Sequence, residues 1–191
     1  LSADLGHYVG DLHVPLHTTR NYNGQLTGQH GIHGLWESRI PELSFDHMKL
    51  ICPNAIYLSN IRDSIWGVYR TSHSLVERVL HEEFELRKKT DPDKMKVFTE
   101  RGQGMRTDFS LRYSMAYQKR LDGMVAGQME KAIHFLGSLW YSCWVNAGQP
   151  TAAHFQRADS INVDAVLATD SLSGRTWNLR TMLGRKEHGY D

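Results

Sequence analysis

The sequence predicts a mainly α-helical domain, on three observations. Apolar residues recur at spacings of three and four along residues 3–14, 55–89 and 108–146, which is the pattern of one face of a helix. Proline or glycine stop signals follow each of these stretches. The length of 191 residues suits a single domain with an apolar core of its own. We therefore expect a multi-helix fold of about four or five helices.

The first predicted helix, residues 3–14, ends at a proline. Pro15 has no N–H to donate to the carbonyl of Asp11, and its ring clashes with that turn. We expect the helix to end or bend near Val14 and the Asp11 carbonyl to be left free. His17 follows the proline, so it need not continue the rotation of the first helix.

A loop and a short helix come next. Residues 18–30 are rich in Asn, Gly, Thr and Gln, and this composition predicts a loop. Residues 31–40 predict a short helix that Pro41 ends, and residues 41–54 predict irregular structure. We expect Trp36, within the short helix, to be buried against the domain. The alternative is an aromatic platform for a substrate.

Two longer segments complete the predicted domain. Residues 55–89 predict one long helical segment, because an Asp-Pro-Asp stop signal follows its charged end. Residues 90–107 contain two glycines and predict a connection. Residues 108–146 predict a second helical segment with a break near Asp122 and Gly123. We expect the Trp, Tyr and Met residues of both segments to lie in the core.

The composition of the chain changes near its end. Residues 1–150 form the predicted helical domain, whereas in residues 151–191 the hydrophobic density falls and Ser, Thr, Asp and Arg increase. We expect this second segment to be a peripheral tail or edge element. The chain lacks an initial methionine and opens in what the pattern predicts to be the middle of a helix. We therefore expect it to be part of a longer protein.

The net charge is +1, from 22 basic and 21 acidic residues, so no general electrostatic attraction to nucleic acid or to an anionic membrane is expected. We therefore expect no stable nucleic-acid partner. The sequence has no run of about 20 apolar residues, which argues against a transmembrane helix, and no signal peptide is visible. The oligomeric state stays open.

The two cysteines, Cys52 and Cys143, do not decide the redox compartment. We expect two separate buried thiols. A disulfide between them requires that the fold bring the two together, which the sequence does not show.

The strongest chemical signal lies in the first 37 residues, which hold five of the eleven histidines. His7 and Asp11 are one helical turn apart, as are His33 and Glu37. An imidazole and a carboxylate at this spacing can bind one cation at about 2.0–2.2 Å. Each pair alone is also typical of an ordinary helix contact. Two pairs with His17 between them, and no thiolate, indicate a metal site that suits zinc, with iron or manganese matched less well.

The other histidines are weaker candidates. His13 is rotated by about 240° from His7 on the first helix, so we interpret it as structural or as a support for the ligands from behind. We expect His30 to be exposed in the loop. The remaining six have no carboxylate at ligand spacing and are interpreted as structural or solvated: His47, His73, His81, His134, His154 and His188.

These residues resemble the motifs of a known family. HYVGDLHVPLH, from His7 to His17, is similar to the HxxxDxxxxxH motif of the zinc-dependent phospholipase C and S1/P1 nuclease superfamily. The sequence HGLWE, from His33 to Glu37, resembles its second motif, HxxxE/D. The sequence LWYSCWVNAGQP that closes the second long segment also resembles the C-terminal half of such proteins. The resemblance covers about residues 1–150.

The resemblance implies a helical domain around a cluster of up to three zinc ions. His7 would bind one zinc, and Asp11 would bridge it to a second. His17, His33 and Glu37 would hold the remaining zinc. The family's N-terminal half supplies further ligands, namely the amino-terminal residue, two early histidines and an early aspartate. None of these precedes His7 here, so we expect one tightly held zinc or fewer.

The activity that the resemblance implies for the intact protein is zinc-dependent hydrolysis of a phosphate ester, as in phospholipase C. Glu37 and the short interval between the two motifs favour the phospholipase branch, with a phospholipid head group as substrate. The alternatives are an S1/P1-type single-strand nuclease or 3′-nucleotidase, and a non-catalytic helical domain with a residual zinc site. Beyond the ligands no catalytic residue can be assigned, and the activity of this chain by itself stays open. The resemblance also implies a secreted or periplasmic protein.

Overall fold

The computed structural model describes residues 2–101 and 104–151. The described residues are mainly helical with one two-stranded sheet, which confirms the prediction of a mainly α-helical chain. By contacts the chain divides into two units, Leu1–Asn146 and Ala147–Asp191, and the elements described below belong to the first. Nearly all of the predicted tail, residues 151–191, lies outside the described residues.

The first helix, α1 (Ser2–Leu12), passes into the short 3-10 helix η1 (Pro15–Thr18). The proline argument predicted a free Asp11 carbonyl, and this was wrong, because the Val14 N–H donates to it at 3.0 Å. The last turn before the proline tightens to bonds that reach three residues back, and these do not need the missing proline N–H. The chain therefore turns out of α1 without an unsatisfied carbonyl at that point.

The short helix of the sequence prediction continues beyond Pro41, so the prediction that this proline ends it was wrong. The helical run consists of α2 (Ile32–Gly34), the π-helical turn η2 (Leu35–Arg39), α3 (Ile40–Ser44) and the 3-10 turn η3 (Phe45–His47). The Ile40 N–H reaches five residues back to the Leu35 carbonyl. The wider π turn lies directly before Pro41, which takes a place in the first turn of α3 where its missing N–H is tolerated.

The predicted long helix over residues 55–89 is two helices, α4 (Ile61–Ser74) and α5 (Val76–Arg87), which meet at Leu75. α4 begins later than predicted because Asn60 caps it: its side chain accepts a hydrogen bond from the Asp63 N–H at 3.1 Å.

The residues before α4 are extended and run along α8 (Met124–Asn146). The Ile56 N–H donates to Ser138 Oγ at 3.1 Å, and the Leu58 N–H donates to Ser142 Oγ at 2.8 Å. Both serines are fully buried. Serine hydroxyls on a neighbouring helix thus satisfy these backbone donors, which is why the apolar spacing at Leu58 does not extend the helix.

Residues 90–107, predicted as a connection, contain regular structure. A short helix, α6 (Pro92–Met95), leads into strands β1 (Lys96–Arg101) and β2 (Gly104–Phe109), which pair as an antiparallel hairpin. Arg39 of η2 donates from Nε to the Phe109 carbonyl at 3.2 Å, so the end of the hairpin is tied to the π turn.

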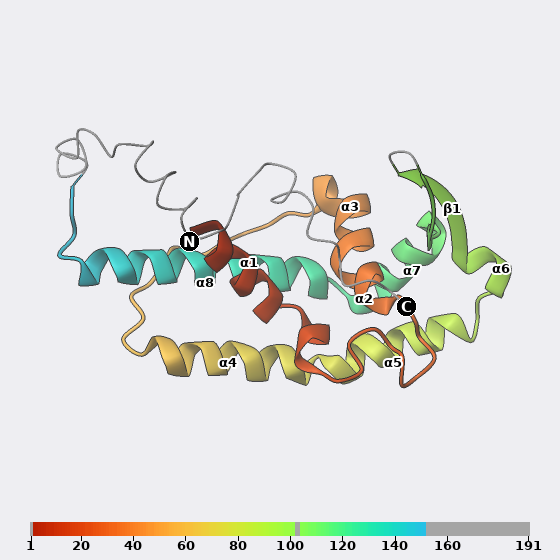
Figure 1. The fold of residues 1–191 in the computed structure, drawn as a ribbon, viewed down its shortest axis with the longest axis horizontal. Helices are drawn as coiled ribbons and strands as arrows, with labels where there is room; N and C mark the ends of the chain where they lie inside the picture. The colour runs from red at the N-terminus through yellow and green to blue at the C-terminus, as the bar shows by residue number, and fades with distance from the viewer. Residues whose placement is uncertain (1, 102–103, 152–191) are drawn as a thin grey trace, which may run out of the picture. The chain divides into compact units, whose positions relative to one another are not determined.

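The second long segment is divided as predicted, into α7 (Leu111–Leu121) and α8. The break lies at Asp122 and Gly123, which have φ angles of 51° and 75°. Both are in the left-handed region, where a glycine carries no steric cost. In Figure 1, α8 and the α4–α5 pair run across the view, and α1 crosses α8 obliquely and descends toward that pair; α1 contacts both α8 and α4.

The main core lies between the helical run from α2 to α3, α5, α7 and the start of α8. Its fully buried side chains include Leu16, Ile32, Leu35, Ile40, Tyr117 and Leu121. Trp36 is 3% exposed, which confirms that it is buried. A smaller cluster of Val9, Phe135 and Leu139 joins α1 to α8. The core thus supports the segments that carry the candidate ligands from behind.

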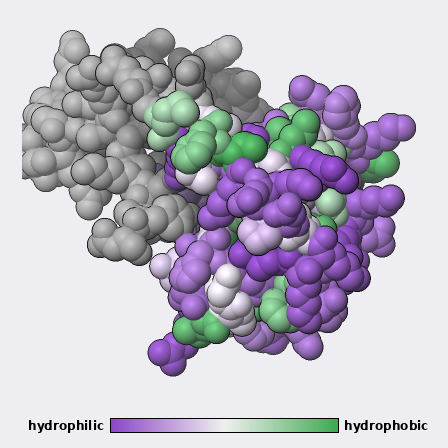
Figure 2. Space-filling view, turned by 90° about the vertical axis from the view of Figure 1, so that its right-hand side faces the viewer, coloured by the Kyte–Doolittle hydropathy of each residue, from purple (hydrophilic) through white to green (hydrophobic). Residues whose placement is uncertain are grey.

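Several aromatic residues expected in the core are exposed instead. Trp66, Trp140 and Trp144 are 53%, 48% and 41% exposed, so that part of the prediction was wrong. Both cysteines are free and exposed rather than buried, because Cys52 lies in the extended segment and Cys143 on the outer side of α8. The face drawn in Figure 2, on the side of α6 and the hairpin in Figure 1, is mainly hydrophilic with separate hydrophobic spots. Among the described helices, none is long and apolar enough to cross a membrane.

Candidate metal centre

Three side chains from two helical segments converge at one point. His17 comes from η1, whereas His33 and Glu37 come from α2 and the π turn. Each offers one possible ligand atom, and the three atoms lie within 4.8 Å of one another. Glu37 Oε2 is 2.6 Å from His33 Nε2 and 3.4 Å from His17 Nε2. These are three of the five ligand candidates identified from the sequence.

The other two candidates, His7 and Asp11, extend this group along α1. His7 Nε2 is 3.4 Å from Asp11 Oδ2, one helical turn away, and Asp11 Oδ1 is 3.8 Å from His17 Nε2. The His7 side chain is 55% exposed and that of Asp11 32%, so this end is open. All five predicted residues therefore form one series of contacts, which converges at Glu37 and is exposed to solvent at His7.

The charges of the three convergent groups are coupled. Burial would raise the pKa of the Glu37 carboxyl, but hydrogen bonds from His17 and His33 outweigh it and lower that pKa to about 2. The hydrogen bond to Glu37 raises the pKa of His17 above its usual value, against the effect of burial. The site thus holds an ionised carboxylate that favours positive charge on its neighbours.

The orientation of the His33 ring bears on what lies between it and Glu37. Its Nδ1 is 3.3 Å from the Tyr22 carbonyl, which can only accept a hydrogen bond, so Nδ1 carries a hydrogen. Nε2 then faces the carboxylate either as a second N–H or as a lone pair. A lone pair at 2.6 Å from a carboxylate oxygen requires a cation between the two atoms. A metal ion meets that requirement, whereas a proton on Nε2 is the first of the two alternatives.

The π turn sets the direction of Glu37. The hydrogen bond from the Ile40 N–H to the Leu35 carbonyl, five residues back, widens the helix at Leu35–Arg39, and Glu37 is at the middle of this turn. Leu35 and Trp36 are buried in the core beside it. π turns occur frequently at functional sites because they displace a side chain from the regular helical position. Here the displaced residue carries the carboxylate that both imidazoles contact.

His17 is held by contacts from α4 to the next residue, Thr18. The Thr18 carbonyl accepts hydrogen bonds from Tyr69 Oη at 3.3 Å and from His73 Nδ1 at 3.1 Å. The hydroxyl of Thr18 donates to the Pro15 carbonyl at 2.6 Å and so closes η1 on itself. The position of His17 is therefore fixed from both ends of the 3-10 turn.

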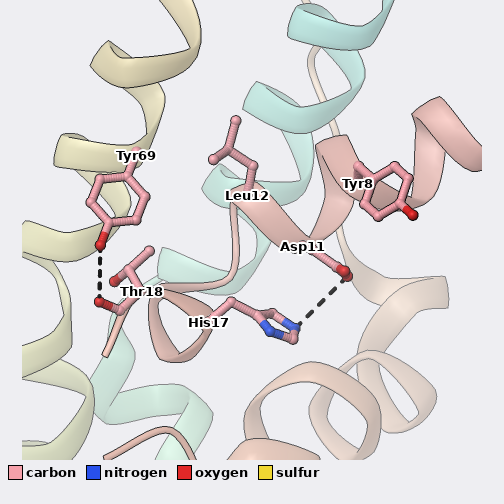
Figure 3. Close-up of a pocket in the computed structure, with 6 residues that line it drawn as sticks. All are labelled: Tyr8, Asp11, Leu12, His17, Thr18 and Tyr69. Atoms are coloured by element: carbon pink, nitrogen blue, oxygen red, sulfur yellow. Dashed lines mark hydrogen bonds and ion pairs between the residues drawn. The ribbon is translucent and has the colours of Figure 1, made fainter. Parts of the chain in front are cut away.

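A small pocket adjoins the open side of the group. It has a volume of about 210 Å³ and is lined by Tyr8, Asp11, Leu12, His17, Thr18 and Tyr69 (Figure 3). Tyr69 forms one wall, and its ring also meets the ring of Trp66 edge to face at 5.6 Å. Two ligand candidates, Asp11 and His17, thus face a pocket whose other walls are largely aromatic and aliphatic.

The histidines set aside in the sequence do not join the group. His13 is buried, and its Nδ1 bonds the Val9 carbonyl at 2.8 Å; burial lowers its pKa. It therefore has a structural place in α1. His30 is exposed in the loop, as expected. His73 contacts Thr18 rather than a ligand, and His154 and His188 lie outside the described residues.

The residues that hold the ligands in place were not identified from the sequence. Tyr69 and His73 were interpreted as core and structural residues, and Tyr22 was not singled out. Tyr69 and His73 lie 51 and 55 residues from Thr18 in the chain, so no local pattern connects them to it. Their role becomes visible only when α4 is placed beside η1.

The donor set fits a zinc ion. Two imidazole nitrogens and a carboxylate oxygen are common ligands of zinc in proteins, and neighbouring donors of a tetrahedral ion are about 3.3 Å apart. The His17–Glu37 pair already has this spacing at 3.4 Å. The His33–Glu37 pair, at 2.6 Å, needs to open by less than about 1 Å to reach it. Three protein ligands leave a fourth position for water or substrate.

Comparisons with known proteins do not assign the chain to a family. A scan against models of known protein families, a search of curated proteins and a search of solved structures each found no match.

Proposed function

We propose that the chain is a zinc-dependent phosphoric ester hydrolase of phospholipase C-like type. The observation that carries the proposal is the convergence of His17, His33 and Glu37 on one point, with Asp11 beside His17. The motif resemblance of the sequence supplies the reaction class. Bound zinc supplies Lewis-acid polarisation of a phosphoryl oxygen and lowers the pKa of a water molecule toward about 7.

The residues of the chain have distinct tasks in this proposal. His17, His33 and Glu37 hold the zinc, and the Tyr22 carbonyl keeps the His33 ring turned toward it. Asp11 is 3.8 Å from His17 and lines the pocket, so its carboxylate can accept a proton or help to bind a second cation. The pocket offers room for a group attached to the phosphate. The phospholipase reading takes a phospholipid head group as the substrate.

A second candidate is a single-strand nuclease or 3′-nucleotidase. Tyr69 forms one wall of the pocket, and an aromatic ring beside the metal ligands can stack on a base, which favours a function on nucleic acid or nucleotides. A third candidate is a non-catalytic helical domain in which the same residues bind zinc without turnover. The three candidates share the metal centre and differ in what the pocket accepts.

The proposal is tested with the zinc-loaded chain on three substrates: phosphatidylcholine vesicles, single-stranded DNA and a 3′-nucleotide. We expect phosphocholine release that a chelator abolishes and zinc restores. His17→Ala and Glu37→Ala should remove both activity and bound zinc. His30→Ala, an exposed histidine of the same loop region, is the matched control and should retain both.

Each other outcome has a definite meaning. Hydrolysis of DNA or of the 3′-nucleotide without release of phosphocholine favours the nuclease. Zinc binding that depends on His17, without hydrolysis of any substrate, favours the non-catalytic domain. Activity and zinc content that are unchanged in both alanine variants contradict the assignment of the ligands.

A further inference from the structure

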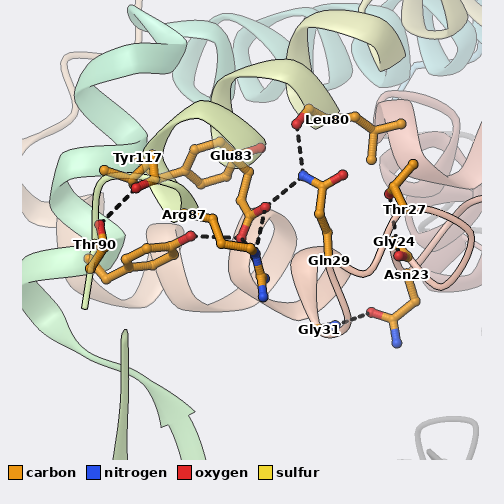
Figure 4. A network of polar contacts seen from close by, with 12 residues as sticks. Asn23, Gly24, Thr27, Gln29, Gly31, Leu80, Glu83, Arg87, Thr90 and Tyr117 are labelled. Carbon is orange, nitrogen blue, oxygen red and sulfur yellow. Dashed lines mark hydrogen bonds and ion pairs between the residues drawn. The ribbon is translucent and has the colours of Figure 1, made fainter. Parts of the chain in front are cut away.

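A buried carboxylate in α5 is fully engaged by donors from three parts of the chain. Glu83 is 0% exposed. It accepts hydrogen bonds from Gln29 Nε2 at 2.6 Å and from Arg87 Nη2 at 2.6 Å (Figure 4). It also accepts one from Tyr113 Oη at 2.7 Å. Arg87 also donates from Nε at 3.0 Å. A buried charge is costly unless it is paired and hydrogen-bonded, and here it is both.

Through Gln29 this network reaches the loop that joins the two groups of candidate ligands. The Gln29 side chain is 1% exposed, and its Nε2 also donates to the Leu80 carbonyl of α5 at 2.8 Å. The backbone N–H of Gln29 donates to the Gly24 carbonyl at 2.8 Å, and its carbonyl accepts from the Ile32 N–H at 3.1 Å. Gln29 is thus bonded to the loop behind it, to α5 and to the first residue of α2.

The path from Gln29 to His33 leaves little freedom. Gly31 has a φ of 91°, and its N–H donates to Asn23 Oδ1 at 3.0 Å. The Leu35 N–H then donates to the Gly31 carbonyl at 3.0 Å, which starts the helical turn that carries His33. A shift of Gln29 relative to α5 would therefore be transmitted through these bonds to the His33 ring.

We propose that Gln29 and Glu83 are positioning residues of the metal centre, which fix the start of α2 against α5 and so hold His33 beside Glu37 and His17. Neither residue is among the ligand candidates, and the two lie 54 residues apart in the chain. The inference rests on the proposed zinc site. It makes the loop between the ligand segments a rigid part of the centre and not only a connection between them.

A purely structural role for the network would lower the stability of every part of the domain alike. A positioning role would weaken zinc binding in chains that are still folded. Substitutions of residues that hold metal ligands in place typically cost about 10–100-fold in metal affinity. The test therefore measures zinc affinity and folding separately, and needs a control that loses stability without touching the loop.

The experiment compares the full chain with Gln29→Met, which keeps the volume of the side chain but has no donor. Zinc affinity is measured by competition with a chromophoric chelator, and the geometry of the site by the visible absorption of bound Co²⁺. Circular dichroism at the same temperature shows whether the chain is folded. We expect Gln29→Met to be folded, with zinc affinity reduced by about 10–100-fold and an altered Co²⁺ spectrum.

Two further variants complete the test. Glu83→Gln removes the charge that accepts from Gln29 and should weaken zinc binding in the same direction; if it fails to fold, Gln29→Met still decides the question. Leu139→Ala is the control, because its cluster with Val9 and Phe135 contains no residue of the loop or of α5. It should lower the melting temperature and leave the zinc affinity and the Co²⁺ spectrum unchanged.

The inference fails if folded Gln29→Met binds zinc like the unaltered chain, or if Leu139→Ala loses as much affinity at an equal loss of melting temperature. In either case zinc binding that still depends on His17 leaves the proposed function in place. An unaltered chain that binds no zinc contradicts the proposed function and this inference together.

Discussion

The imidazole rings of His17 and His33 meet edge to face, with their centroids 4.7 Å apart and their planes at 86°. The two rings come from separate helical segments, and the Nε2 atoms of both face Glu37 Oε2. Two protonated imidazoles this close repel each other. A single divalent cation shared by both rings would remove that repulsion and use the same carboxylate, so the ring contact is compatible with the proposed metal site.

The first prediction concerns the number of zinc ions. His17, His33 and Glu37 supply three ligands, whereas His7 and Asp11 supply only two at the exposed end. We expect about one tightly bound zinc per chain, because three protein ligands complete a stable site and two do not. The measurement is metal analysis by mass spectrometry after dialysis against metal-free buffer.

The variants of this experiment separate the two ends of the group. His33→Ala should leave less than a tenth of the zinc bound, whereas His7→Ala should leave most of it, on the order of the unaltered amount. Three zinc ions per chain, or an equal loss in both variants, would show that the exposed end binds metal as firmly as the convergent one.

The pairing of ligands within each segment could be predicted from the sequence. The spacing of His7 with Asp11 and of His33 with Glu37 places each pair on one face of a helix, and the structure has both pairs in contact. Pro15 indicated that the chain turns before His17. These inferences need only local geometry, which is why they did not require the fold.

Contacts between distant segments could not be predicted in this way. The π turn at Leu35–Arg39, the extended segment along α8 and the hairpin of β1 and β2 each depend on partners elsewhere in the chain. The bond between Gln29 and Glu83 spans 54 residues. The apolar spacing at Leu58 is the same whether the backbone N–H groups bond within a helix or to serine hydroxyls on a neighbouring helix, as they do here. The spacing alone therefore cannot distinguish the two structures.

The second prediction concerns Pro41 and the π turn. Alanine at this position supplies an N–H that can donate to the Glu37 carbonyl, as in a regular α-helix. We expect Pro41→Ala to return the turn to α-helical register and to raise the melting temperature. The i,i+4 spacing keeps Glu37 beside His33 in a regular helix, but Glu37 would rotate relative to His17 on the separate segment η1, so the zinc affinity should fall by about tenfold or more.

Pro92→Ala is the matched control for Pro41→Ala. Pro92 begins α6, where a proline needs no N–H, and it lies far along the chain from the ligands. This variant should leave the zinc affinity unchanged. If Pro41→Ala gains stability and binds zinc as before, the π turn does not determine the position of the carboxylate.

The third prediction concerns stability at alkaline pH. Burial, together with the hydrogen bond to Glu83, raises the pKa of Tyr113 well above the value of about 10 for an unfolded chain. A raised folded pKa contributes stability that is fully present below pH of about 10 and is lost as the pH rises further. We expect the melting temperature to fall between pH 9 and 11, and to fall less steeply in Tyr113→Phe.

The same variant should be less stable at pH 8 by about 1–3 kcal/mol, because it loses a hydrogen bond to a buried charge. Tyr57→Phe is the control, because Tyr57 is 47% exposed. It shows the effect of losing a phenol hydroxyl at the surface. Burial also raises the pKa of Tyr117, so some alkaline loss should persist. Equal slopes in the Tyr113→Phe variant and the unaltered chain would contradict the coupling to Glu83.

The last prediction concerns the pocket beside Asp11 and His17. Tyr69 forms one wall, and a flat ring attached to a bound phosphate can pack against it. An aromatic pair is worth about 0.5–1.5 kcal/mol, which is a factor of about 2–10 in affinity. We expect the zinc-loaded chain to bind phenyl phosphate more tightly than methyl phosphate by such a factor. Isothermal titration calorimetry measures both affinities.

Substitutions at Tyr69 distinguish a ring that contacts the ligand from one that only supports η1. Tyr69→Phe keeps the ring and loses the hydrogen bond to Thr18, so the preference for phenyl phosphate should persist. Tyr69→Leu should bring the two affinities together while zinc stays bound. If both variants lose zinc to the same extent, zinc binding depends on the Tyr69 hydroxyl and not on the ring, because the hydrogen bond of the hydroxyl to Thr18 holds His17 in place. If neither variant changes the preference, the substituent of the phosphate lies outside this pocket.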